Sequence, residues 1–321
     1  MSNNKSTTEE SFTGFLHTGN HGTFMRLPGV QPDSEQLKAS GVDVAFIGFP
    51  WDAMCISRTG TNYGPRAIRD ASDQFSFFNA NRDLDLSKHY KMADCGDVHV
   101  NPGAAVQTMA RAEKMVEKIL ESGAMPVTIG GDHSITIACV RAFAKKYRGA
   151  GLVLVDTHFD TAIDFDGEQL SHTCPIARAV DAGFDPKRIA LVGIGGWLNP
   201  KSERDYAVEY GIKVFSVEDI WEQGAAEIAK QAAKVASNGT GDVYLTFDID
   251  SIDAAYAPGT GVSTPGGMNS REAITMAYEL GKMGISGFDL VEVSPSWDSD
   301  GITSRLAVRL ILEVLAGNAQ R

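Results

Sequence analysis

The arrangement of apolar residues along the chain constrains its fold more than any other feature. Short runs rich in Val, Ile, Leu and Phe alternate with helix-length amphipathic stretches from residue 42 onward. The runs are nearly continuous, which is typical of strands buried on both faces of a parallel sheet covered by helices. They span residues 42–49, 124–130, 151–156, 189–194, 212–217, 243–248 and 287–293.

The stretches between these runs have the length and composition of helices. They cover residues 104–122, 134–147, 201–210, 224–237, 270–283 and 302–316. The alternation predicts a single-domain α/β fold, a doubly wound parallel sheet with helices on both faces. We find no internal repeat, low-complexity tract or linker rich in Pro and Ser. The 321 residues therefore divide into a polar N-terminal lead-in, residues 1–40, and one α/β domain, residues 41–321.

Charge and composition exclude several classes of partner. The chain has 29 Lys and Arg against 41 Asp and Glu, a formal net charge of −12. Neither nucleic acid nor an anionic membrane surface is expected as a partner, because both need basic patches. The polar N-terminus and the lack of an apolar run of about twenty residues argue against a secretory signal and a membrane span. The four cysteines lie far apart without a CxxC pair, so we expect reduced thiols and a cytoplasmic location.

Carboxylate and histidine side chains gather at the ends of three predicted strands. They are His133, Asp156, His158, Asp160, Asp248 and Asp250. In an open parallel sheet, ligands bind beyond the carboxyl ends of the strands. Alternate residues of an extended segment point to the same side, so the residues of each Asp-x-His-x-Asp or Asp-x-Asp spacing can converge on one point.

Carboxylates that crowd around one point repel one another strongly unless cations neutralise them. Two divalent ions would balance the negative charges of Asp156, Asp160, Asp248 and Asp250. His133 and His158 would add neutral nitrogen ligands. The spacing therefore predicts a site for two divalent metal ions at this edge of the sheet.

The same residues resemble the metal motifs of a known family. GGDHS (130–134), DTHFD (156–160) and TFDIDSIDAAYAPGTG (246–261) are similar to the three metal motifs of the ureohydrolases, the arginase–agmatinase family. The resemblance extends to WDAMCISRTGTNYGPRAIRDAS (51–72) and GFDLVEVSPSWD (287–298). TFMRLP (23–28) resembles the lead-in of the agmatinase and guanidinobutyrase branch, so the resemblance runs from about residue 23 to the C-terminus.

This resemblance implies an arginase-like catalytic domain that binds two divalent ions, with Mn²⁺ preferred and Ni²⁺ the main alternative. One ion would be held by His133, Asp156, Asp160 and Asp248. The other would be held by Asp156, His158, Asp248 and Asp250. A guanidinium carbon is a poor electrophile because its charge is delocalised over three nitrogens. Attack on it needs a hydroxide at neutral pH, and divalent ions can supply one by lowering the pKa of water to about 7.

Three residues are predicted to take part directly in the chemistry. Glu292 stands where the family has the carboxylate that pairs with the substrate guanidinium, and such a pair both binds and orients. His172 stands where the family has its proton-shuttling histidine, which would protonate the departing amine. Asp160 is the third predicted catalytic residue, and it is also a predicted metal ligand.

The chain departs from the family pattern near the predicted catalytic pocket. Thr157 replaces the alanine of the second motif, Thr173 stands where a glycine is usual, and 262–264 (VST) replace a frequent TPE. The ligands are complete, so these departures predict retained chemistry with altered substrate selection. Thr173 would narrow the route for a substrate tail. The HTCP segment, 172–175, also resembles relatives that act on small guanidines and tend towards nickel.

The predicted function is hydrolysis of a small cationic guanidino compound to urea and an amine. Guanidine, an alkylguanidine or biguanide, and a guanidino acid are the candidate substrates, and arginine is disfavoured. An agmatinase or 4-guanidinobutyrase proper is the alternative. The resemblance implies a homo-oligomer, a trimer or hexamer. Two further hypotheses are a non-catalytic subunit that stabilises a paralogue in a hetero-oligomer, and a single-metal, deacetylase-like enzyme.

Overall fold

The computed structural model describes residues 22–237 and 242–321 of the chain. Eight parallel strands form one sheet in the order β4-β1-β5-β10-β9-β6-β7-β8. In that order the strands are Met92–Asp97, Val44–Phe49, Met125–Gly130, Gly287–Val291, Val243–Asp248, Gly151–Val155, Ile189–Ile194 and Lys213–Ser216. A small antiparallel hairpin, β2 (Phe78–Asn79) with β3 (Leu84–Asp85), lies outside this sheet.

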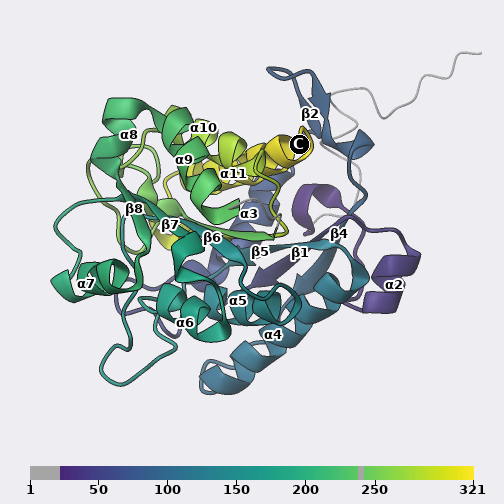
Figure 1. Ribbon diagram of the computed structural model, residues 1–321. Coiled ribbons are helices and arrows are strands. Elements are labelled where there is room, and N and C mark those ends of the chain that lie inside the picture. The colour runs from purple at the N-terminus through teal and green to yellow at the C-terminus, as the bar shows by residue number, and fades with distance from the viewer. Residues whose placement is uncertain (1–21, 238–241) are drawn as a thin grey trace, which may run out of the picture.

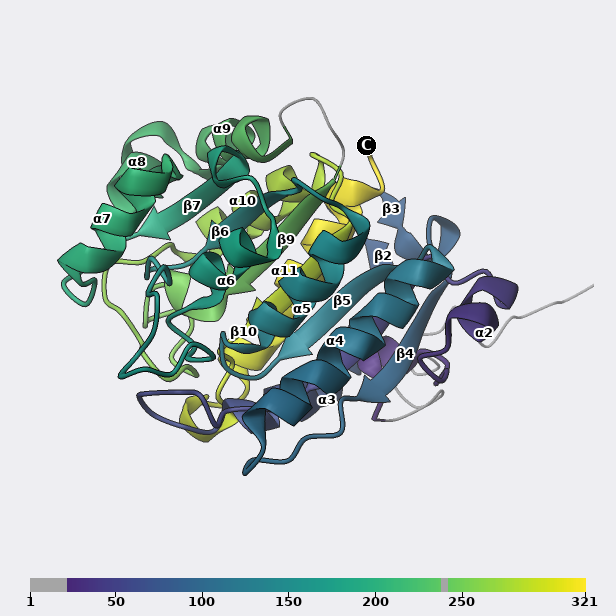
Figure 2. The ribbon, with the colours of Figure 1, turned by 60° about the horizontal axis from the view of Figure 1, so that its bottom comes forward.

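Helices cover both faces of the sheet (Figures 1 and 2). One face carries α4 (Ala105–Ser122), α5 (Ile135–Lys146) and α6 (Pro175–Ala182). The other carries α3 (Gly64–Ser72), α9 (Ala225–Ser237), α10 (Ser270–Gly281) and α11 (Ile302–Asn318). The other α-helices of the described chain are α2 (Ser34–Ala39), α7 (Lys201–Tyr210) and α8 (Val217–Gln223). The predicted doubly wound, single-domain α/β fold is therefore confirmed.

Two apolar clusters explain why the strand sequences are continuously hydrophobic. In β1, Val44 and Phe46 pack into one cluster, whereas Ala45, Ile47 and Phe49 pack into the other. Each cluster fills the space between one face of the sheet and the helices that cover it. A polar side chain on either face of such a strand needs a buried hydrogen-bond partner, so most positions are apolar.

The sheet edges differ from the prediction for a physical reason. The predicted strand 212–217 forms the edge strand β8, in which only Phe215 is buried. At the opposite edge, β4 was not predicted as a strand. Its sequence, MADCGD, lacks β-branched residues and ends in exposed Gly96 and Asp97. An edge strand needs less apolar surface, so the composition signal weakens there.

Part of the predicted lead-in packs against the domain. Phe24 is fully buried and stacks on Phe46 with ring centroids 4.3 Å apart. Its backbone N–H donates to Asp94 Oδ2 over 2.8 Å, and Asp94 also pairs with buried Arg69. Residues 1–21 of the lead-in lie outside the described part of the chain. No helix among the described residues is both long enough and apolar enough to cross a membrane.

Candidate metal centre

The carboxyl ends of neighbouring parallel strands bring the predicted residues to one edge of the sheet. In the sheet, β10 lies between β5 and β9, and β9 pairs with β6. His133 follows the end of β5, Asp156 follows β6, and Asp248 is the last residue of β9. Asp250 lies in the short 3₁₀ helix that begins directly after Asp248.

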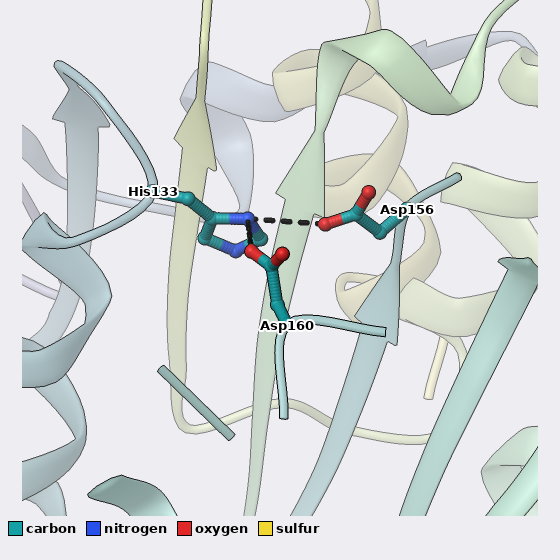
Figure 3. A group of neighbouring side chains, drawn as sticks. All are labelled: His133, Asp156 and Asp160. Atoms are coloured by element: carbon teal, nitrogen blue, oxygen red, sulfur yellow. Dashed lines mark ion pairs between the residues drawn. The ribbon is translucent and has the colours of Figure 1, made fainter. Parts of the chain in front are cut away.

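His133 lies at the centre of one group of carboxylates. Its Nδ1 is 3.1 Å from Asp156 Oδ2, 2.9 Å from Asp160 Oδ2 and 3.1 Å from Asp248 Oδ2. Figure 3 shows Asp156 and Asp160, both from the segment that follows β6, approaching the same ring nitrogen. The ring is only 1% exposed, so the group is closed from bulk water on the side of the sheet.

His158 lies in a second group that shares Asp156 with the first. His158 Nδ1 is 3.3 Å from Asp156 Oδ1 and 3.2 Å from Asp250 Oδ2. The two oxygens of Asp156 therefore face the two histidines separately. Ligand atoms of His133, Asp156 and Asp160, and those of Asp156, His158 and Asp250, each lie close enough together to hold one metal ion. All six predicted ligands thus come together around two neighbouring points.

The donor atoms of this cluster are suited to a cation rather than to one another. His133 Nδ1, Asp156 Oδ2 and Asp250 Oδ1 are buried and form no well-directed hydrogen bond, although the first two lie 3.1 Å apart. Leaving a buried polar atom unpaired costs about 1–3 kcal/mol, and more for a charged group. Two imidazoles with several carboxylate oxygens form a donor set typical of divalent transition ions. The residues present therefore fit a metal centre.

The pKa values of the clustered side chains also indicate a site for cations. Burial, then the charges of Asp250 and Asp156, raise the pKa of Asp248 well above its ordinary value. Burial also raises the pKa of Asp250 to about 7. For His133, burial opposes the charged form, but the neighbouring carboxylates outweigh it and raise the pKa. Without metal, the raised pKa values favour protonated Asp248, Asp250 and His133. Bound cations would instead stabilise the ionised carboxylates.

The backbone is strained at two of the predicted catalytic residues. Asp160 has φ of 50° and Glu292 has φ of 65°, values that non-glycine residues rarely adopt. Each such residue costs roughly 1–3 kcal/mol and persists only where the surrounding structure holds it. Close packing supports Glu292: its N–H donates to Gly131 O over 2.9 Å. A Cβ on Gly131 would lie 2.3 Å from Trp51 O, so only glycine fits there.

Glu292 and His172 form a pair beside the metal cluster. His172 Nδ1 lies 3.0 Å from Glu292 Oε1, and His133 N–H donates to the same oxygen over 2.8 Å. Ile56 N–H contacts His172 Nε2 at 3.2 Å. Burial opposes the charged form of His172, but Glu292 outweighs it and raises the pKa of His172 to about 9. Burial alone would raise the pKa of Glu292, but His172 outweighs burial, and the pKa is lowered.

A cavity of about 640 Å³ opens above this cluster. We call the six predicted metal ligands the floor. We call the lining segments 56–57, 161–165, 198–200 and 202–203, together with Val262, the wall. Ile56, Ile163 and Leu198 of the wall are 49%, 60% and 57% exposed, so the wall offers apolar surface to a ligand. A volume of this size is within the usual range for small-molecule sites.

The departures from the family pattern lie at or beside the wall. Thr173 and Val262 line the cavity. The Thr173 hydroxyl is 3.1 Å from that of Ser171. Thr157 is buried, and its carbonyl accepts a hydrogen bond of 2.9 Å from the Asn199 side chain, which ties the wall to the end of β6.

A buried polar network below His133 was not predicted from the sequence. His133 Nε2 is 2.9 Å from Thr246 Oγ1, which is 3.4 Å from Thr136 Oγ1. Thr136 donates to Asp289 Oδ2 over 3.0 Å, and the Tyr244 hydroxyl donates to the same oxygen over 2.7 Å. With its proton on Nε2 facing Thr246, His133 presents the lone pair of Nδ1 to the centre of the cluster. Polar residues inside an apolar strand, such as Asp289 in GFDLV, are the signal that could have found it.

Comparison with known proteins identifies one family for nearly the whole chain. Residues 42–317 match the profile of the family described as the Arginase family. The chain is 37% identical over 294 residues to the mitochondrial guanidino acid hydrolase of Homo sapiens, covering 91% of this chain and 81% of that protein. It is 36% identical over 281 residues to the mitochondrial agmatinase of Gallus gallus, covering 87% of this chain and 82% of that protein.

The fold also resembles solved structures. That of the proclavaminate amidino hydrolase from Streptomyces clavuligerus matches with a TM-score of 0.85 at 33% sequence identity. The match covers 94% of this chain and 99% of that one. Sequence and fold similarity therefore both extend over almost the whole chain, and the metal cluster lies within the matched region.

Proposed function

This chain belongs to the arginase family, and on that premise we propose that it hydrolyses a guanidino compound to urea and an amine. The observation that carries the proposal is the pair of His and Asp groups that share Asp156 at the floor of the cavity. The completeness of this cluster gives no support to a non-catalytic subunit. Asp250 beside His158 favours two ions over the single ion of a deacetylase-like site.

We assign the floor residues as ligands of two divalent ions. The first set is His133, Asp156, Asp160 and Asp248, and the second is Asp156, His158, Asp248 and Asp250. When bound, the two cations would neutralise the carboxylates and lower the pKa of water enough for it to attack a guanidinium carbon. Mn²⁺ is the preferred ion because oxygen donors dominate, and Ni²⁺ is the main alternative because of the two imidazoles.

Glu292 is assigned to the substrate guanidinium. Its contacts with His133 N–H and His172 both involve Oε1. We assign Oε2 to an N–H of the substrate. Because Glu292 is buried and its pKa is lowered, it stays ionised and forms a charge-assisted bond that fixes the orientation of the guanidinium.

His172 is assigned as the acid that protonates the departing amine. Burial opposes the charged ring, but Glu292 outweighs it and raises the pKa of His172 to about 9, which favours a protonated ring over the neutral one whose Nε2 accepts from Ile56 N–H. Its Nδ1 proton faces Glu292 Oε1 and is therefore held beside the group that would orient the substrate. Transfer of this proton to the amine nitrogen prevents the amine from leaving as an anion.

The substrate is a small or non-arginine guanidino compound. Relatives of this chain carry the names guanidino acid hydrolase and agmatinase, which supports a non-arginine guanidino substrate. An agmatinase or a 4-guanidinobutyrase proper is the alternative within the same reaction class. We further propose that the protein is cytoplasmic and forms a homo-oligomer, a trimer or hexamer. Light scattering would measure the mass of this oligomer.

A metal-reconstitution experiment tests the proposed function. The purified protein is stripped with a chelator and reloaded separately with Mn²⁺ and Ni²⁺. Each preparation is then assayed for urea from guanidine, an alkylguanidine, agmatine, 4-guanidinobutyrate and arginine, with elemental analysis alongside. We expect two ions per chain and urea from at least one non-arginine compound. Absence of urea from every compound at full metal loading would contradict the proposal.

A further inference from the structure

The charge of the cavity lining is strongly one-sided. Asp160, Asp248, Asp250 and Glu292 belong to the floor or to the pair beside it, and the wall adds Asp164 and Glu203. Among the described residues that line the cavity, none is a lysine or an arginine. Two bound divalent ions would offset the carboxylates of the floor but would leave those of the wall uncompensated.

Glu203 differs from the other wall carboxylate because it is buried. Asp164 is exposed and accepts a hydrogen bond from Gly167 N–H. Glu203 is only 7% exposed, and no ion pair with a Lys or Arg forms at its side chain within the described residues. A buried carboxyl group that lines a cavity and has no Lys or Arg partner is suited to a cationic ligand.

The position of Glu203 relative to the floor is well defined. It lies in the first turn of α7, where the helix dipole favours a negative charge. Its backbone carbonyl accepts a hydrogen bond of 2.8 Å from Thr161 Oγ1, and Thr161 directly follows Asp160. The Asn199 side chain further ties the start of this segment to Thr157 O. The buried carboxyl is therefore held at a set place on the wall rather than on a free loop.

The cations nearest in sequence to the wall are engaged elsewhere. Arg58 follows the wall segment 56–57, but its guanidinium donates to Gly261 O and stacks over the Trp297 ring at 4.4 Å. Lys201 and Arg204 adjoin wall residues of α7, but both side chains are exposed and pair with Asp205. A carboxylate at the tail of a substrate would therefore meet carboxylates and apolar surface rather than a positive charge.

We propose that Glu203 binds the non-reacting end of the substrate, and that this end is a cationic, hydrogen-bond-donating group rather than a carboxylate. The inference rests on the proposed function, because it assumes that the guanidinium lies at Glu292. The apolar wall residues Ile56, Ile163 and Leu198 would contact the hydrocarbon chain between the two polar ends. The preferred substrate class is a guanidine with a second cation on a short aliphatic chain.

Three compounds with the same tetramethylene chain test this inference. Agmatine carries an ammonium group at the end of the chain, pentylguanidine a methyl group, and 5-guanidinopentanoate a carboxylate. We expect kcat/KM to fall in that order, with about a hundredfold between the ammonium and carboxylate compounds, because like charges placed together are strongly disfavoured. Equal or faster turnover of the carboxylate compound would overturn the proposal.

The variant Glu203→Gln assigns the effect to one residue. It should reduce the preference for agmatine over pentylguanidine by about tenfold, because a hydrogen bond to a charged group is replaced by a neutral one. A purely structural role for Glu203 would lower both rates together and leave their ratio unchanged, which would also overturn the proposal. Glu209→Gln, on the exposed side of the same helix, is the matched control and should leave the ratio as it is.

Failure of the proposed function has a different signature. If none of the three compounds gives urea from the metal-loaded protein, the hydrolase assignment fails. The charge preference is then read from binding, measured by calorimetry with the same three compounds on the parent and the Glu203→Gln variant. Tighter binding of agmatine that depends on Glu203 supports the assignment of this carboxyl. Equal binding of all three compounds overturns it.

Discussion

The floor and the wall of the cavity are built in different ways. The floor residues follow strands in the middle of the sheet, they are mostly buried, and their side chains converge on two points. The wall comes from segments between strands and helices, and several of its apolar side chains are exposed. Of the departures from the family pattern, Thr173 and Val262 line the cavity, whereas Thr157 is buried between the floor residues Asp156 and His158. Rigid strand ends can hold reactive groups in place, while loops change the substrate without disturbing them.

Replacement of a floor ligand should give the largest effect. Asp248→Ala removes a carboxylate that faces His133 at 3.1 Å, and we expect loss of bound metal with a decrease in urea production of more than about 100-fold. Elemental analysis and the urea assay measure the two losses. Asp70→Ala, at an exposed site on α3, is the control. Retention of full metal content and activity would show that Asp248 is no ligand.

The pair beside the floor should affect the chemical step without affecting metal binding. His172→Ala should lower kcat by about 10²–10⁴, the usual contribution of a general acid, while the metal content stays the same. His89→Ala, at an exposed histidine, controls for loss of an imidazole. If metal content fell together with kcat, His172 would belong to the floor rather than to the proton-transfer step.

The buried carboxyl of the wall should destabilise the metal-free protein at high pH. The folded-state pKa of Glu203 is raised to about 7, so the cost of its charge is absent below its ordinary pKa and complete above about pH 7. Glu203→Gln should therefore increase the free energy of unfolding at pH 8 by about 3 kcal/mol, and by progressively less as the pH falls. Urea denaturation at several pH values measures this, and a gain independent of pH would contradict it.

The network below the floor should tune the affinity for metal. Asp289→Asn weakens the polar chain that reaches His133 through Thr136 and Thr246, and the affinity should fall by about 10–100-fold. Titration of the metal-free protein by calorimetry measures it. Tyr244→Phe removes only one donor to Asp289 and should have a smaller effect. An unchanged affinity in Asp289→Asn would mean that the network serves packing alone.

A change of side-chain volume at Thr173, which lines the cavity, should have the smallest effect on catalysis. Thr173→Gly should raise kcat/KM for an alkylguanidine relative to guanidine itself by up to about tenfold, because it removes side-chain volume from the route of the tail. Thr173→Ser keeps the hydroxyl near Ser171 and should give an intermediate ratio. The opposite order would show that the Thr173 methyl group contacts the tail favourably.

The central strands were predictable because burial on both faces leaves a strong composition signal. Residues 189–194, for example, form β7 with the predicted bounds. The helix bounds also agree to within a few residues, as in α4, predicted at 104–122 and observed at Ala105–Ser122. The edge strand β4 gave no such signal, because its MADCGD sequence combines small and charged residues.

The candidate site was predictable where its residues cluster in short motifs. Asp156, His158 and Asp160 are close in sequence, and their alternate spacing is enough to indicate that the three side chains can converge. Thr246, Asp289 and Glu203 are isolated polar residues in apolar or helical segments. A lone polar residue in an apolar strand, as at Asp289, indicates a buried network but not its partners, whereas Glu203 lies among other charged residues of a helix and has no such signal.

The sequence by itself determined the order of the central strands and of most of the longer helices, and the residues that could hold two cations. Hydrophobic periodicity and short charged motifs are local, so they can be read directly along the chain. Only the tertiary structure decided that Asp156 faces both histidines, that Asp289 reaches His133 through two threonines, and that Glu203 enters the cavity beside the floor. These contacts join residues far apart in the chain, and their geometry depends on how the sheet and its helices pack.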